Sequence, residues 1–167
     1  REMVERHLNT TVLFVCSGNT CRSPMAQMLF ERRLADALDV PEERLEEKGF
    51  RVISAGTAAG HGGTAAHQAT AVMKKQGLDL RDHETRPVTA ELVDRASAIW
   101  CMGPGHARAI LTWNPEARHK IFLLDEEGIP DPFGADVAAY EEVAEHIDRG
   151  LDRPLERFLD ELSWKGI

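Results

Sequence analysis

The sequence has few aromatic residues, few cysteines and no excess of positive charge. Its 167 residues include 28 Asp and Glu against 20 Lys and Arg, so the formal net charge is −8. A negatively charged surface repels a phosphate backbone, which argues against general nucleic-acid binding. Three cysteines are an odd number and too few for a disulfide framework, so they indicate free thiols in a reducing, cytoplasmic compartment.

Long apolar runs are also missing. None approaches the ~20 residues that a membrane-spanning helix needs, and the polar residues 1–10 lack the apolar core of a secretory signal. We therefore expect no association with membranes. The hydrophobic content of 43% is nevertheless enough to bury a sizeable core without disulfides.

Short apolar runs alternate with segments of helical periodicity. The pattern predicts strands at 11–15, 51–55, 98–102 and 120–124, and helices at 23–38, 64–76 and 106–113. A last helical stretch, from 140 to 162, contains Gly150 and Pro154, which predict a break near Arg153. This alternation is typical of an α/β fold whose parallel sheet is covered by helices on both faces. Binding sites in such sheets form at the carboxyl ends of the strands.

The loop after the first predicted strand carries a Cys-x5-Arg motif, in the sequence Cys16-Ser17-Gly18-Asn19-Thr20-Cys21-Arg22-Ser23-Pro24. Ser23 and Pro24 suit the N-cap and first turn of a helix, while Gly18 and Asn19 tolerate the positive φ of a tight loop. Backbone N–H groups in such a loop, next to a helix N-terminus, form an anion site. Arg22 adds a planar fork suited to two phosphoryl oxygens.

Cys16 lies at the bottom of this predicted anion site. A helix N-terminus and a neighbouring cation favour a thiolate, and the Ser23 hydroxyl is placed to donate to it. Cys16 is therefore a candidate nucleophile toward phosphorus. The alternative interpretation is a buried cysteine beside an ordinary strand-to-helix turn.

A second motif, Asp131-Pro132-Phe133-Gly134, follows the fourth predicted strand. Pro132 fixes the backbone after Asp131, and the loop allows this carboxyl group to approach a bound phosphate as a general acid. Taken alone, the motif is more typical of a plain Asp-Pro turn.

Residues Val12 to Ala26, together with the Asp131 motif far downstream, resemble the low-molecular-weight protein tyrosine phosphatase family. The resemblance covers about residues 11–163. It implies an α/β three-layer sandwich with a central four-stranded parallel sheet flanked by helices and a phosphate-binding loop after the first strand. It also implies one phosphatase domain at 11–163, between an N-terminal arm at 1–10 and a C-terminal tail at 164–167.

The family assigns chemistry to matching positions. Cys16 matches the nucleophile that forms a cysteinyl phosphate, Arg22 the phosphate-binding arginine, and Asp131 the general acid that later activates water. Residues matching phosphate or substrate contacts are Ser17, Gly18, Asn19, Thr20, Cys21 and Phe133; supporting residues are Ser23 and His83, the latter matching a histidine that holds the loop asparagine. The resemblance implies no metal or other cofactor, phosphorylated proteins as partners, inorganic phosphate as product, and a monomer.

Three positions depart from the tyrosine-specific pattern. Thr20 stands where those enzymes tend to have isoleucine, Gly134 replaces a second aromatic residue, and the segment 57–61 lacks the large aromatic that often lines the ring slot. Thr20 with Asp-Pro-Phe-Gly is similar to the bacterial protein-arginine phosphatase branch, where threonine is thought to help select the P–N bond. We therefore predict phosphoarginine as the substrate, with phosphotyrosine as the alternative.

Two further classes and one redox hypothesis stay open. Arsenate reductases of this fold need two relay cysteines close in sequence, but only Cys101 lies downstream, in a segment suited to core packing. A phosphate-binding module would need neither a nucleophile nor an acid. Peroxide could convert Cys16 to a sulfenic acid that Cys21 traps as a disulfide; the alternative is that Cys21 only fills the loop.

Overall fold

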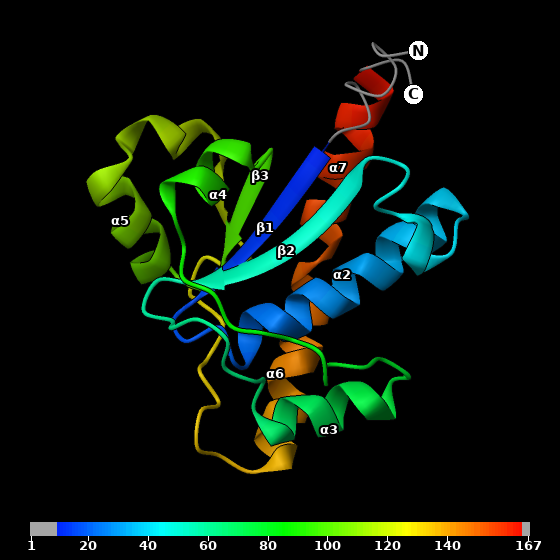
Figure 1. Ribbon diagram of the computed structural model, residues 1–167, viewed down its shortest axis with the longest axis vertical. Helices are drawn as coiled ribbons and strands as arrows, with labels where there is room; N and C mark the ends of the chain where they lie inside the picture. Colours follow the sequence, from blue (N-terminus) through cyan, green and yellow to red (C-terminus); the bar gives the residue numbers. More distant parts are fainter. Residues whose placement is uncertain (1–9, 165–167) are drawn as a thin grey trace.

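The computed structural model describes residues 10–164, and its centre is a four-stranded sheet. Strands β1 (Thr10–Cys16), β2 (Phe50–Gly56), β3 (Ala98–Cys101) and β4 (Ile121–Leu123) lie in the order β2-β1-β3-β4 (Figure 1). All three pairings are parallel, and Val12 of β1 lies between Val52 of β2 and Ala98 of β3. The predicted four-stranded parallel sheet is confirmed.

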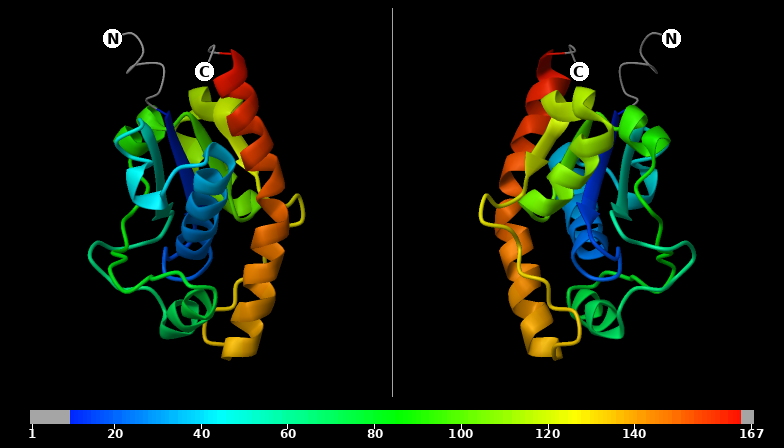
Figure 2. Two further views of the ribbon diagram at one scale, coloured as in Figure 1. Left: turned by 90° about the vertical axis from the view of Figure 1, so that its right-hand side faces the viewer. Right: turned by 90° about the vertical axis from the view of Figure 1, so that its left-hand side faces the viewer.

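Helices cover both faces of this sheet. On one face, Val12, Phe14 and Trp100 pack with residues of α2 (Arg22–Leu38), α3 (His67–Lys75), α6 (Val137–Gly150) and α7 (Asp152–Trp164). On the other, Leu13, Val15 and Ile99 pack with α4 (Ala90–Arg95) and α5 (Pro104–Trp113). Because side chains alternate along a strand, each apolar run of β1 and β3 serves both cores. Figure 2 shows α6 and α7 running end to end along one side of the molecule.

Several predicted helix boundaries were wrong. Helix α2 begins at Arg22 with Cys21, not Ser23, at the N-cap. Helix α3 begins at His67 rather than residue 64, because the Ala66 N–H donates to the Thr20 carbonyl and keeps the preceding segment extended. Helix α5 begins at Pro104, two residues before the predicted start at residue 106. The C-terminal break falls at Leu151, close to the predicted position.

Three short helices were not predicted. Helix α4 has six residues, and the Thr89 hydroxyl caps it by accepting from the Leu92 N–H at 3.2 Å; η1 (Glu42–Arg44) and η2 (Pro115–Lys120) are single 3₁₀ segments. Such lengths are too short to display a helical period. Of the predicted arm at 1–10 and tail at 164–167, only Thr10, which is part of β1, and Trp164, which ends α7, lie within the described residues.

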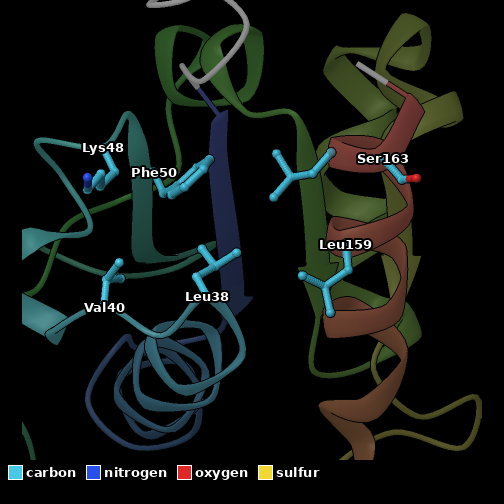
Figure 3. Close-up of a pocket in the computed structure, with 7 residues that line it drawn as sticks. Leu38, Val40, Lys48, Phe50, Leu159 and Ser163 are labelled. Carbon is cyan, nitrogen blue, oxygen red and sulfur yellow. The ribbon is translucent and has the colours of Figure 1, made fainter. Parts of the chain in front are cut away.

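An apolar groove of about 450 Å³ opens at the amino end of the sheet. Leu38 and Phe50 lie across it from Leu159 on α7 (Figure 3). The Cys-x5-Arg motif is at the opposite, carboxyl end of β1, so this groove is separate from it. Within residues 10–164, no helix is long and apolar enough to cross a membrane.

Glu31 on α2 is an unfavourably placed carboxylate. Burial and the nearby Glu42 and Glu46 raise the pKa of Glu31 to about 7, although it accepts a hydrogen bond from the Gln27 amide at 2.9 Å. A carboxyl group with a raised pKa in the folded state stabilises the fold fully below its unfolded pKa of 4.5 and loses that contribution as pH rises through about 7.

Replacing Glu31 with glutamine should therefore stabilise the protein at alkaline pH. We expect the free energy of unfolding to increase by about 1–3 kcal/mol at pH 8, and the difference from wild type to shrink at pH 5. Urea unfolding at the two pH values measures this, with the exposed Glu43→Gln as the matched control. A gain of equal size at both pH values would contradict the assignment.

Candidate active site

The Cys-x5-Arg loop connects the central strand β1 to α2. Cys16 ends β1 with its side chain buried, and its sulfur lies 2.9 Å from the Ser23 hydroxyl on the first turn of α2. Ser23, predicted as an N-cap, is instead inside the helix, where its hydroxyl faces the thiol. The Cys16 thiol, at the carboxyl end of a strand, therefore faces the N-terminus of a helix of 17 residues.

Asn19 holds the loop in shape. It adopts φ = 58°, as predicted, whereas Gly18 has no positive φ and is not required on that ground. The fully buried Asn19 amide donates to the hydroxyls of Ser23 at 2.8 Å and Ser54 at 3.0 Å, and its oxygen accepts from the Arg86 N–H at 3.0 Å. A left-handed backbone and three side-chain hydrogen bonds, two donated and one accepted, are both suited to asparagine.

His83 supports the same residue from outside the loop. Its Nε2 lies 2.8 Å from the Asn19 carbonyl oxygen, so this nitrogen carries a hydrogen and donates. Burial lowers the pKa of His83, against the opposing effect of this bond. A neutral imidazole with its hydrogen on Nε2 therefore fixes the loop backbone, in the place predicted for the supporting histidine.

Arg22 and Asp131 come together above the loop. The Arg22 side chain is buried, and its Nη1 donates to the Ile129 carbonyl at 3.0 Å, while its Nη2 lies 3.4 Å from the Asp131 carboxylate. Asp131 is about half exposed and also accepts from the Phe133 N–H at 3.1 Å. Phe133 itself is 76% exposed beside the carboxylate. The structure thus brings together motifs separated by more than a hundred residues.

Besides Ser54 and Arg86, which bond to Asn19, three residues that contact Arg22 or Ser17 were missed from the sequence. Ile129 acts through its carbonyl, so its side chain gave no signal. Gly56, at the end of β2, approaches the loop so closely that a Cβ atom would lie 2.3 Å from the Ser17 carbonyl. His106 on α5 lies with its Nε2 2.9 Å from the Ser17 hydroxyl. The position of Gly56 at a strand end was the only available hint.

The other loop residues have defined surroundings. Thr20 is half-buried, with its hydroxyl 3.4 Å from the Cys21 sulfur, which in turn lies 3.2 Å from the Tyr140 hydroxyl. Cys16, Cys21 and Cys101 are all free thiols. A disulfide between Cys16 and Cys21 under peroxide stays a prediction.

Cys101 lies in different surroundings from the two loop cysteines. It packs in the core on the α4 and α5 side of the sheet, and burial raises the pKa of its thiol to about 12. A thiol held neutral in this way is a poor relay for a disulfide exchange. Across residues 10–164, no cluster of three or more His, Cys, Asp or Glu side chains is arranged to hold a metal ion.

This geometry suits phosphoryl transfer. The buried Cys16 thiol lies at the N-terminus of a helix, the Arg22 guanidinium contacts Ser17 of the same loop, and the partly exposed Asp131 carboxylate lies 3.4 Å from that guanidinium. These are the groups needed for nucleophilic attack, for charge stabilisation and for protonation of a leaving group.

Comparisons with known proteins agree with this arrangement. The family model described as low molecular weight phosphotyrosine protein phosphatase matches residues 11–163. A probable low molecular weight protein-tyrosine-phosphatase of Ralstonia solanacearum is 37% identical over 145 residues, covering 85% of this chain and 91% of the relative. A protein-arginine-phosphatase of Geobacillus stearothermophilus is 33% identical over 156 residues, covering 90% and 97%.

A solved structure extends the comparison to the fold. The crystal structure of a low molecular weight protein tyrosine phosphatase from T. tengcongensis superposes with a TM-score of 0.78 at 32% identity, covering 89% of this chain and 99% of that one. Because both the family model and these relatives span nearly the whole domain, the chain belongs to the low molecular weight phosphotyrosine protein phosphatase family and is a cysteine-based phosphatase.

Proposed function

We propose that the chain dephosphorylates proteins at phosphoarginine, with Cys16 as nucleophile. The Cys16 thiolate attacks phosphorus while the bond to the leaving nitrogen breaks, and Asp131 gives that nitrogen its proton. Arg22 and the loop N–H groups stabilise the transferring phosphoryl group. Water then attacks the cysteinyl phosphate, Asp131 takes a proton from it, and the Ser23 hydroxyl donates to the departing thiolate, 2.9 Å away.

The observation that carries the phosphoarginine assignment is Thr20 in the phosphate loop. A guanidine leaving group presents N–H donors, and these favour oxygen acceptors at the rim over an apolar wall. The half-buried Thr20 hydroxyl and the partly exposed Asp131 carboxylate are such acceptors. The relative from Geobacillus stearothermophilus that is named a protein-arginine-phosphatase supports the same assignment.

Phosphotyrosine is the second candidate, and Phe133 is the observation that favours it. Its ring is 76% exposed next to Asp131, where it could stack on the ring of a substrate. The sequence argues against a full aromatic slot, because residue 134 is glycine and residues 57–61 are Thr, Ala, Ala, Gly and His, with no second large aromatic. The relative from Ralstonia solanacearum named a tyrosine phosphatase supports this candidate.

The test is phosphate release from two peptides of matched sequence, one with phosphoarginine and one with phosphotyrosine. We expect at least a tenfold preference for phosphoarginine in kcat/KM, and a loss of most of that preference in Thr20→Ile. Cys16→Ser provides the blank, and Thr112→Ile on the exposed side of α5 the control for the substitution. Equal turnover of both peptides by wild type and Thr20→Ile would remove the basis of the assignment.

A further inference from the structure

His106 is a buried histidine that borders the phosphate loop without belonging to it. It lies on the first turn of α5, is 8% exposed, and contacts the Ser17 hydroxyl through Nε2 at 2.9 Å. Its other ring nitrogen, Nδ1, is buried and has no hydrogen-bond partner. The side-chain hydrogen bond of His106 is therefore made to an active-site atom, the Ser17 hydroxyl oxygen.

The unpartnered nitrogen determines which way the hydrogen bond runs. A hydrogen on Nδ1 would be a buried donor without an acceptor, which folded proteins rarely tolerate. Neutral His106 therefore carries its hydrogen on Nε2 and donates it to the Ser17 oxygen. Burial, together with the nearby Arg22, lowers the pKa of His106, while Asp131 and a backbone contact with Gly103 act in the opposite direction.

Ser17 connects His106 to Arg22, because its hydroxyl contacts both side chains. The Ser17 oxygen also accepts from Arg22 Nη2 at 3.5 Å, and the same Nη2 faces the Asp131 carboxylate at 3.4 Å. A serine hydroxyl has two lone pairs, so it can accept from both His106 and Arg22. The imidazole thereby fixes an oxygen that orients one arm of the guanidinium.

The turn that bears His106 also packs tightly against the loop that bears the acid. The Ile129 N–H donates to the Met102 carbonyl at 2.6 Å, and a Cβ at Gly128 would lie 3.6 Å from the Gly103 Cα. Ile129 in turn accepts from Arg22 Nη1 at 3.0 Å. Both arms of the guanidinium are therefore held by groups connected to the β3–α5 turn.

We propose that His106 is a positioning residue of this phosphatase, which acts through the Ser17 hydroxyl to hold Arg22 in the orientation that receives the phosphoryl group. It touches neither substrate nor the reacting atoms in this arrangement. Its contribution is to reduce the motion of the fork before the substrate arrives, and small displacements of such groups are costly in rate.

The test is a double-mutant cycle between positions 106 and 17, with p-nitrophenyl phosphate as substrate. His106→Phe fills the space without a donor and is expected to lower kcat/KM by about tenfold and to raise the inhibition constant of inorganic phosphate by a similar factor. Ser17→Ala should lose about as much, and the double variant no more than the larger single loss. His106→Gln, whose amide nitrogen can reach the Nε2 position, should stay within about threefold of wild type.

Controls separate positioning from folding. The thermal midpoint of each variant is measured, and His106→Asn replaces His106→Phe in the cycle if the latter does not fold. His119→Phe, at an exposed histidine of η2, controls for the substitution itself. Three outcomes would overturn the proposal. They are single losses of kcat/KM that multiply in the double variant, equal losses of kcat/KM in His106→Gln and His106→Phe, and wild-type kinetics in His106→Phe.

Discussion

Asp131→Asn should lower kcat for a phosphopeptide by about 10²- to 10⁴-fold, the range typical of a lost general acid–base group. The amide keeps the size of the side chain but cannot protonate the leaving group or accept a proton from water. The loss should be smaller for attack on p-nitrophenyl phosphate, because its leaving group departs without protonation. In the wild type the carboxylate is at the mouth of the site, 3.4 Å from Arg22.

Steady-state kinetics on both substrates, with the early burst of nitrophenol recorded, measure this effect. The exposed Asp160→Asn on α7 is the matched control. If Asp131→Asn slowed formation of the cysteinyl phosphate equally for both leaving groups, the carboxylate would be acting by holding Arg22 instead of by transferring protons.

Gly56→Ala should lower kcat/KM by at least about 100-fold, although the substitution adds only one methyl group. That Cβ would lie 2.3 Å from the Ser17 carbonyl and 3.0 Å from the Asn19 nitrogen. Both are backbone atoms of the phosphate loop and cannot turn aside as a side chain can. The loop must move, and its N–H groups would then no longer converge on the phosphoryl oxygens.

Gly60→Ala is the matched control for this change, because a Cβ there meets no atom within 4 Å. We expect Gly60→Ala to keep wild-type kinetics. Thermal unfolding of both variants shows whether Gly56→Ala is folded. A folded Gly56→Ala enzyme with wild-type kcat/KM would mean that the loop tolerates the displacement and that its backbone position is not critical.

The sequence was most informative about features that are formed by residues close together in the chain. The buried strand before Cys16, the small residues after it and Arg22 are contiguous, so the loop and its anion-binding character could be predicted from their order. The alternation of strands with helices likewise predicted a parallel sheet. The order β2-β1-β3-β4 depends on which runs pair in three dimensions, and no single segment encodes it.

What could not be predicted depends on contacts between distant segments. Gly56 and His106 lie 40 and 90 residues after Cys16, and each resembled an ordinary loop or helix residue until the sheet brought it to the loop. Ser23 was misassigned for a different reason. A serine before a proline suits an N-cap, but the helix starts one residue earlier than Ser23, so that its hydroxyl can face the Cys16 thiol.

The burial of Cys16 has a consequence for the length of the side chain that can react. Only 2% of Cys16 is exposed, and Arg22 of the same loop is 7% exposed. A phosphoryl group on a short serine side chain would have to draw the peptide backbone into the loop to reach the sulfur. A phosphoryl group at the tip of a long arginine or tyrosine side chain reaches further. We therefore expect the burial of Cys16 to favour long phosphorylated side chains over short ones.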